Sequence, residues 1–182
     1  MSVDGAQLVA RAREAVERSF SGTEARPADE AWWLEPAATF VTLTRGGQLR
    51  GCIGSVTPRR GLLEDVEHNA RAAAFQDPRF SPLRADELDA VRFEVSLLGP
   101  LEPIRFTDEA DALRQLRPHV DGVVLSWQRH RALFLPQVWD QLPEPSRFLA
   151  ALKRKAGLSP DFWAADVRLE RFEVHKWKES RE

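Results

Sequence analysis

The spacing of apolar residues along the chain predicts helices in four places. After Asp4, a favourable N-cap residue, apolar positions recur every three or four residues as far as Phe20. Thr107 is the expected cap of the third helix, Pro145 suits the first turn of the fourth, and Gly157 is suited to end it. The same period places the second, third and fourth helices at residues 62–74, 108–116 and 145–156.

Alternation of apolar and polar residues predicts strands between these helices. The predicted strands cover residues 40–44, 49–56, 91–98, 123–126, 131–135 and 169–177. Gly46 and Gly47 lie between the first two strands and indicate a tight hairpin turn. Residues 21–36 are expected to form a loop that Trp32 and Trp33 anchor onto the core. This arrangement predicts an α+β fold, with mainly antiparallel strands and helices packed on them.

The order strand, strand, helix, strand occurs twice along the chain. The tetrapeptide Arg-Phe-Glu-Val at residues 92–95 recurs at residues 171–174, 79 positions later. The two predicted hairpins recur at a similar offset. We therefore expect one domain over residues 1–182 that contains an internal structural duplication, with repeat one at about 38–98 and repeat two at about 121–178.

The composition is that of an ordinary globular domain. The chain has 182 residues, of which 43% are hydrophobic and 30% charged. The formal net charge is −2, with acids and bases interspersed, which makes nucleic acid an improbable partner. No apolar run reaches the length of a membrane span, so no membrane association is expected.

The single cysteine makes an intramolecular disulfide impossible and favours a reducing, cytoplasmic location. The start of the chain lacks the basic and apolar regions of a signal peptide, in agreement with that location. Only four of the 26 basic residues are lysines, a bias that suggests a GC-rich bacterial genome.

Polar side chains gather on one face of the first predicted sheet. Successive side chains of a strand point to opposite faces, and the apolar set of each strand is expected to face a common core. The opposite face then carries Thr42, Thr44, Arg50, Cys52, Glu94 and Ser96.

This face has the elements of a thiol site. An arginine beside a cysteine stabilises the thiolate, so Arg50 is the candidate activator of a nucleophilic Cys52. Glu94 is the candidate base, or the group that orients Arg50. Gly51 and Gly54 have no side chains and would let a ligand approach the backbone.

Structural explanations exist for the same residues. Cys52 fits an inert packing position, since free cysteines are commonly buried. Arg50 and Glu94 fit a cross-strand ion pair, and the glycines fit a β-bulge. The second repeat has apolar residues, about 132–134, where the first has Arg-Gly-Cys, and this asymmetry favours a functional site in the first.

No metal or cofactor site is predicted. The four histidines show no metal-ligand spacing, and one cysteine cannot hold a zinc or iron–sulfur centre. The sequence has no phosphate-binding or dinucleotide-binding glycine motif. The apolar segment 134–139 is a candidate pocket wall or partner contact.

Several motifs resemble one family. The hexapeptide Leu-Arg-Gly-Cys-Ile-Gly at residues 49–54 resembles the signature of the AMMECR-type domain, called AmmeMemoRadiSam system protein A in bacteria. The other matching segments are Asp-Pro-Arg-Phe at 77–80, Phe-Glu-Val-Ser-Leu-Leu at 93–98, Phe-Leu-Pro-Gln-Val-Trp at 134–139 and Lys-Ala-Gly-Leu at 155–158. The resemblance covers roughly residues 38–178.

The resemblance implies a duplicated α+β fold and two partners. These are a Memo-like protein, similar to non-haem-iron dioxygenases, and a radical S-adenosylmethionine (SAM) protein. It implies no particular reaction. The site residues carried over are Arg50, Gly51, Cys52 and Gly54, with Glu94 and Ser96 nearby. One hypothesis is therefore a thiol-dependent component of a modification pathway. The other is a non-catalytic scaffold or binding module for a small anionic ligand or a partner protein.

Overall fold

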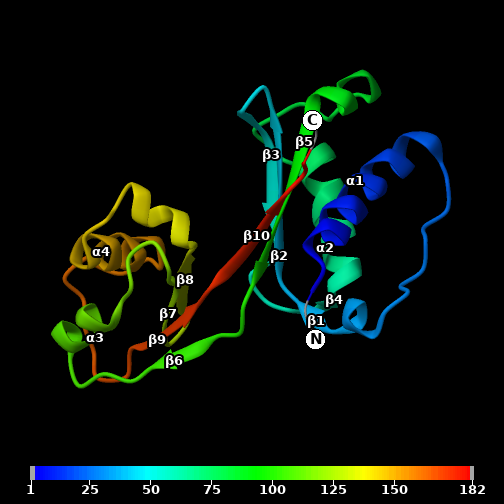
Figure 1. Ribbon diagram of the computed structural model, residues 1–182. Helices are drawn as coiled ribbons and strands as arrows, with labels where there is room; N and C mark the ends of the chain where they lie inside the picture. The colour runs from blue at the N-terminus through cyan, green and yellow to red at the C-terminus, as the bar shows by residue number, and fades with distance from the viewer. Residues whose placement is uncertain (1–2, 181–182) are drawn as a thin grey trace. The chain divides into compact units, whose positions relative to one another are not determined.

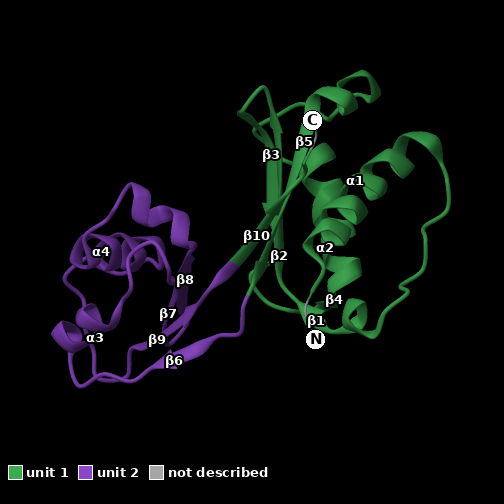
Figure 2. Cartoon of the chain, in the orientation of Figure 1, with its two compact units in different colours: residues 1–98, 175–182 green, residues 99–174 purple. Residues whose placement is uncertain are grey.

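The computed structural model describes residues 3–180, which form two compact units (Figure 2). Unit 1 contains residues 1–98 and 175–182, and unit 2 contains residues 99–174. Each unit has its own cluster of buried apolar residues. The prediction of an α+β fold is confirmed, while a single domain over residues 1–182 stays a prediction.

Unit 1 is a four-stranded antiparallel sheet with two helices on one face (Figure 1). The sheet order is β10-β5-β2-β3, from strands β2 (Thr39–Arg45), β3 (Gln48–Gly54), β5 (Val91–Leu98) and β10 (Val174–Lys178). The helices are α1 (Gly5–Ser21) and α2 (Leu62–Phe75), and their apolar sides form the core with the sheet. The short elements are 3-10 helices η1 (Ala31–Leu34) and η2 (Ala85–Ala90) and the paired strands β1 (Pro36–Ala37) and β4 (Arg60–Gly61).

Local sequence signals account for the ends of these elements. The Asp4 side chain accepts hydrogen bonds from the backbone of Ala6 and Gln7, which confirms it as the cap of α1. Gly46 and Gly47 have φ values of 57° and 79°, the left-handed geometry that a two-residue hairpin turn needs.

Unit 2 repeats this plan with shorter elements. Its sheet order is β6-β9-β7-β8, from strands β6 (Glu102–Ile104), β7 (Gly122–Trp127), β8 (His130–Phe134) and β9 (Arg168–Phe172). Its helices are α3 (Glu109–Gln115), η3 (Pro136–Asp140) and α4 (Pro145–Lys155). Asp108, rather than the predicted Thr107, caps α3, because its carboxylate accepts from the Asp111 backbone.

The two units share one strand order, which confirms the predicted structural repeat. In each, the hairpin (β2-β3 or β7-β8) is followed by a helix and by a strand that pairs with the first hairpin strand. The fourth strand of each sheet comes from elsewhere in the chain. β6 follows β5 but pairs with β9, and β10 follows β9 but pairs with β5.

The predicted strand over 169–177 is therefore two strands in two sheets. Glu173 separates β9, which pairs in the unit 2 sheet, from β10, which pairs with β5. The repeated tetrapeptide is also out of structural register. Thr42 opposes Glu94, whereas Val124, its predicted counterpart, opposes Glu170 and not Glu173.

The segment 134–139, a predicted pocket wall or partner contact, contributes Trp139 to the core of unit 2, and Phe134 and Val138 pack partly buried against that core. The Trp139 ring is fully buried and stacks on Phe148 with a centroid distance of 3.7 Å. Its indole N–H donates to the carbonyl of Asp121 at 2.7 Å. The packing of this side chain accounts for the tryptophan of the segment, while its prediction as a contact surface stays a prediction.

Candidate functional site

Three strands of unit 1 bring polar side chains into one row. Thr42 lies opposite Cys52 on β3 and opposite Glu94 on β5. The neighbouring residues of β2, Val41 and Leu43, point into the core and are fully buried. The predicted polar face therefore forms, with the thiol, a hydroxyl and a carboxylate side by side.

Arg50 does not join this row as predicted. Leu43 opposes Gly51 while Thr44 opposes Leu49, so Arg50 is the extra residue of a β-bulge. Its guanidinium donates to both oxygens of Glu87 at 3.1 Å and to the carbonyl of Ser81 at 3.0 Å. The expected contact of Arg50 with Glu94 is absent, because the bulge resets the alternation of the strand.

Glu94 and Ser96 lie on β5, the strand on which the sequence pattern predicted them. Glu94 pairs with Lys178 of β10, with 3.1 Å between carboxylate oxygen and ammonium nitrogen. Ser96 is buried, with 6% of its surface exposed. The row is therefore continued by a cation from a fourth strand, which the sequence pattern did not indicate.

The two signature glycines are required by packing inside unit 1. A Cβ on Gly51 would lie 2.1 Å from the backbone oxygen of Ala73, so the glycine lets α2 approach β3. A Cβ on Gly54 would lie 2.2 Å from the Phe40 ring. The space predicted for a ligand is at these two positions filled by the protein.

The immediate surroundings of Cys52 come from β2 and from the loop after α2. The Thr42 hydroxyl donates to the Cys52 sulfur at 3.3 Å. The Cys52 backbone N–H donates to Asp77 at 2.9 Å, and its carbonyl accepts from Arg79 at 3.3 Å. As a residue, Cys52 is half-buried. The Asp-Pro-Arg-Phe motif at 77–80 could have signalled this contact, but the sequence pattern did not place it beside the strand.

Asp77 and Arg79 form a tight ion pair at this edge. The Arg79 guanidinium hydrogen bond holds the pKa of the Asp77 carboxyl well below its usual range, and the Cys52 N–H contributes in the same direction. The pKa of Arg79 is raised, chiefly by its hydrogen bond to Asp77. Arg79, rather than Arg50, is the cation that contacts Cys52, through the Cys52 backbone carbonyl.

A buried polar network fixes the end of the signature strand. Asp65 on α2 is fully buried and accepts hydrogen bonds from the Thr39 backbone and hydroxyl. It also accepts from Ser55, Asn69 and Arg60. The carboxylate therefore ties α2 to the ends of both hairpin strands.

The Arg50–Glu87 ion pair is expected to make the stability of the folded protein depend on pH. The Arg50 hydrogen bonds lower the pKa of Glu87 from 4.5 to about 2. A carboxylate whose pKa is lowered by folding stabilises the folded state above its unfolded pKa, and that stabilisation is lost as the pH falls toward 2. We expect Glu87→Gln to reduce stability at pH 7 by on the order of 1 kcal/mol, with the deficit shrinking below about pH 4.

Urea unfolding followed by circular dichroism at several pH values measures this difference. Asp86→Asn is the matched control, because its exposed side chain pairs with exposed Arg84. A deficit for Glu87→Gln that is equal at pH 7 and pH 3 would contradict the assigned role of Arg50.

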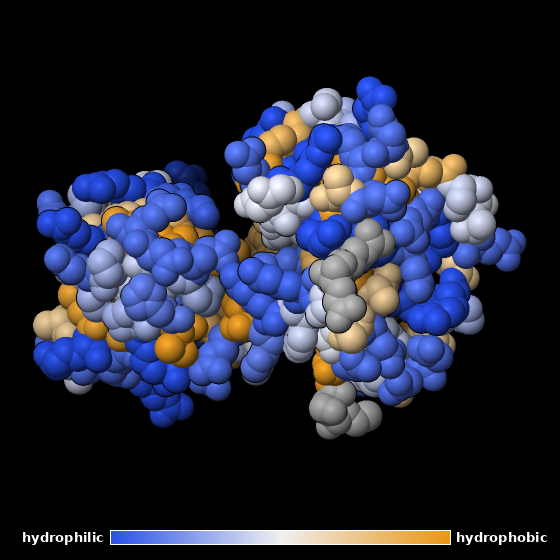
Figure 3. All heavy atoms as spheres, turned by 45° about the horizontal axis from the view of Figure 1, so that its top comes forward, coloured by the Kyte–Doolittle hydropathy of each residue, from blue (hydrophilic) through white to orange (hydrophobic). Residues whose placement is uncertain are grey.

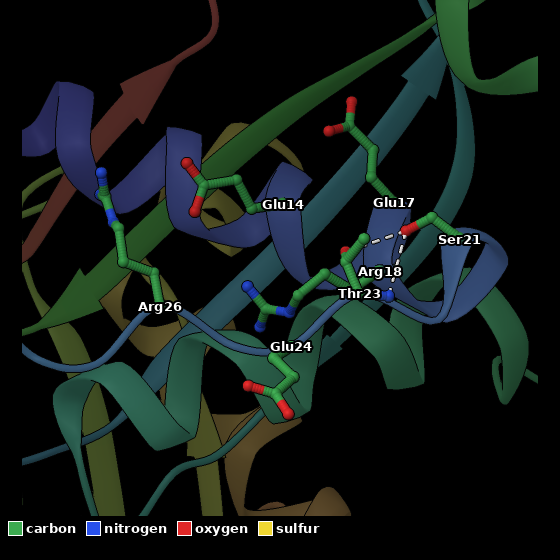
Figure 4. A pocket seen from close by; sticks show the side chains of 7 residues that line it. All are labelled: Glu14, Glu17, Arg18, Ser21, Thr23, Glu24 and Arg26. Carbon is green, nitrogen blue, oxygen red and sulfur yellow. Dashed lines mark hydrogen bonds between the residues drawn. The ribbon is translucent and has the colours of Figure 1, made fainter.

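Two cavities lie elsewhere in the chain. One, of about 400 Å³, is open and lies along the end of α1 (Figure 4). It is lined by Glu14, Glu17, Arg18, Ser21, Thr23, Glu24 and Arg26. Its Arg18 is already paired with Glu67 at 2.8 Å. The other, of about 510 Å³, lies along β6 and β9 of unit 2. Neither is lined by Cys52 or Arg79.

The surface and the acidic side chains do not indicate other chemistry. On the face shown in Figure 3, hydrophilic residues cover most of both units and break up the apolar patches. Within residues 3–180, no group of three or more histidine, cysteine, aspartate or glutamate side chains is arranged to hold a metal ion. In the same range no helix combines the length and apolar character needed to span a membrane.

Comparisons with known proteins agree with the fold and with the signature. A protein of Methanothermobacter thermautotrophicus is 37% identical over 97% of this chain and 94% of its own length. A protein of Aeropyrum pernix is 40% identical over 97% of this chain and 79% of its own. Both organisms are archaea, and so these relatives give the expected bacterial source no support.

A solved structure has the same fold. The crystal structure of the uncharacterized protein PH0010 from Pyrococcus horikoshii superposes with a TM-score of 0.81 and 34% identity, covering 96% of this chain and 91% of that one. The sequence model of the AMMECR1 family matches residues 9–177. The signature strand, the repeated fold and these matches together place the chain in the AMMECR1 family.

Proposed function

We propose that this protein is a thiol-bearing component of a modification pathway that also uses a Memo-like protein and a radical SAM protein. The resemblance of its motifs to the AMMECR-type domain supports these partners, and the single cysteine supports a cytoplasmic location. The observation that carries the thiol role is the position of Cys52. Cys52 is half-buried, its sulfur accepts a hydrogen bond from Thr42 on the neighbouring strand, and the Arg79 guanidinium donates to its backbone carbonyl.

In this proposal Cys52 is the nucleophile or carrier thiol. The role of thiolate activator and anion anchor, first expected for Arg50, passes to Arg79, because Arg79 contacts the Cys52 backbone whereas Arg50 is turned toward Glu87. Glu94 is a base or orienting group one strand beyond Thr42. Arg50, Gly51, Gly54 and Ser96 shape the strands that carry the site.

A second function is favoured by a separate observation. The charged groups first expected to do chemistry are held in ion pairs, Arg50 with Glu87 and Glu94 with Lys178. Charged side chains that are held in ion pairs within the protein are typical of a structural role. The protein would then be a non-catalytic scaffold or binding module whose Cys52 edge contacts a small anionic ligand or a partner protein.

The rate at which Cys52 is alkylated distinguishes the two functions. Because the chain has a single cysteine, any thiol label is attached at Cys52. The probe is iodoacetamide, from which the thiolate sulfur displaces iodide. A nucleophilic role predicts that the native protein reacts at neutral pH at least as fast as the urea-unfolded chain. Cys52→Ser is the blank.

Reaction that begins only on unfolding would overturn the thiol role and leave the scaffold. For the scaffold, Cys52→Ser is expected to co-purify with the Memo-like or radical SAM protein as wild type does.

A further inference from the structure

Unit 2 carries a row of arginines across one end of its sheet. Ser126 on β7 lies opposite Arg131 on β8 and opposite Arg168 on β9. β6 ends one position before Arg105, and its antiparallel register with β9, if continued, places Arg105 next to Arg168. Residues directly opposite each other have Cβ atoms about 5 Å apart, so three guanidinium groups and one hydroxyl share a narrow strip.

This row lies on the face of the sheet that is turned away from the core of unit 2. Leu125 precedes Ser126 in β7 and belongs to that core. Leu169 follows Arg168 in β9 and belongs to it as well. Because successive side chains of a strand point to opposite faces, Ser126 and Arg168 point away from the core. All three arginines of the row are exposed to solvent.

The arginines of the row are not neutralised by the protein. Within the residues that the structure describes, their guanidinium groups form no ion pair and donate no hydrogen bond. Other arginines of unit 2, such as Arg114 and Arg117, are held by carboxylates. Like charges that face each other across a sheet destabilise it, so the fold gains nothing from Arg105 beside Arg168. Such a concentration of one charge attracts an anion.

Two of these arginines line the cavity of about 510 Å³ along β6 and β9, neighbouring strands in the sheet of unit 2 (Figure 1). Its wall combines hydrogen-bond donors with apolar side chains, among them Arg105, Arg168, Ser126, Phe106 and Val167. The volume is in the range of sites for small organic ligands. The cavity therefore offers cationic donors and an apolar surface to the same molecule.

Two carboxylates belong to the surroundings of the cavity. Glu170 lines it, two residues after Arg168 and on the same face of β9. Asp166 lies in the loop before β9 and accepts a hydrogen bond from the Trp127 indole at 2.8 Å. Two lining arginines against one lining carboxylate leave the wall with an excess of positive charge.

We propose that this cavity binds a small molecule that carries a phosphate group, with the phosphate on Arg105, Arg168 and Ser126 and the apolar part on Phe106. A guanidinium presents a planar fork of N–H donors that fits carboxylate and phosphate oxygens. A carboxylate has two oxygens, whereas a phosphate monoester has three terminal oxygens that can accept from both forks and from the hydroxyl. The site belongs to unit 2 and does not depend on the thiol function proposed for Cys52.

The experiment is an NMR titration of the full chain with phenyl phosphate at about pH 8, where the phosphate is a dianion. Ionic strength is held constant with sodium chloride, because screening acts on every exposed charge. We expect saturable shifts at the backbone amides of Ser126, Arg168 and Phe106. Inorganic phosphate should shift the same amides with about tenfold lower affinity, since it lacks the apolar part.

Variants of single charges test the assignment of the donors. Arg105→Gln and Arg168→Gln should each weaken the binding of phenyl phosphate about tenfold, because each removes a charge-assisted contact. Glu170→Gln should strengthen it. Arg129→Gln is the matched control, since it removes the same charge from an exposed arginine of the β7-β8 turn that does not line the cavity.

Stability separates binding from a structural role. Arg168→Gln should leave the free energy of unfolding unchanged or raised, because it relieves a contact between like charges. A structural arginine would lower it on removal. If Arg168→Gln does not fold, the same comparison is made with Arg105→Gln.

Three results would overturn the proposal. The first is the absence of saturable shifts at these amides, or shifts that sodium chloride alone reproduces. The second is an equal loss of affinity in Arg129→Gln, which would indicate attraction by the overall charge. The third is binding of benzoate as tight as that of phenyl phosphate, which would contradict the choice of phosphate over carboxylate.

Discussion

Replacing Asp65 with alanine is expected to lower the free energy of unfolding of unit 1 by about 3–5 kcal/mol. The carboxylate is fully buried and satisfies the Thr39 N–H and hydroxyl together with the Asn69 amide. Its removal would leave the buried Thr39 N–H and hydroxyl without their acceptor, and each costs free energy when it is unpaired, whereas Asn69 keeps the Thr39 carbonyl as an acceptor. Arg60 would lose its buried counter-charge at the same time.

Hydrogen exchange measured on peptides of the native protein tests this expectation unit by unit. Faster exchange is expected in α2, β2 and β3, and unchanged exchange in α4 of unit 2, because the two units have separate cores. Glu64→Ala is the matched control, since this neighbouring carboxylate is 71% exposed and lies 3.8 Å from Arg60. Equal effects of the two variants would contradict the role given to the network.

Trp139→Ala is expected to destabilise unit 2 by about 3–5 kcal/mol. The ring is fully buried against Phe148, and its truncation would leave a large cavity in the core. The carbonyl of Asp121 would also lose the indole donor. Both losses act on the junction of β7, η3 and α4.

Here the exchange pattern should be reversed, with faster exchange in β7 and α4 and little change in α2. Asp140→Ala is the matched control, because this exposed neighbour makes a surface contact with His119. Unchanged exchange in unit 2 of Trp139→Ala would contradict the core role given to Trp139 and would favour a contact role for segment 134–139.

Periodic signals in the sequence were sufficient for most of the fold. Val91–Leu98 forms a strand with the predicted bounds, and the Gly46-Gly47 turn has the expected geometry. These features depend on residues close in the chain, where period and turn chemistry act directly. The predicted row of Thr42, Cys52 and Glu94 also forms, because the apolar sides of three strands do share one core.

The ion-pair partners of the charged residues could not be predicted from the periodic pattern of the sequence. A bulge moves Arg50 out of the alternation, and nothing local distinguishes Glu87 from Glu94 as its partner. The identical tetrapeptides at 92–95 and 171–174 are misleading for a similar reason. One lies within β5, and the other spans the interruption between β9 and β10.

The α+β class, the repeated order of elements and the polar face around Cys52 follow from the hydrophobic period and the turn residues of the chain. Three features emerge only when the elements pack: Asp77 and Arg79 bind the backbone of Cys52, Asp65 ties α2 to the hairpin, and β10 completes the unit 1 sheet. These contacts join residues 25 or more positions apart, and such pairing depends on how the elements pack rather than on any local pattern.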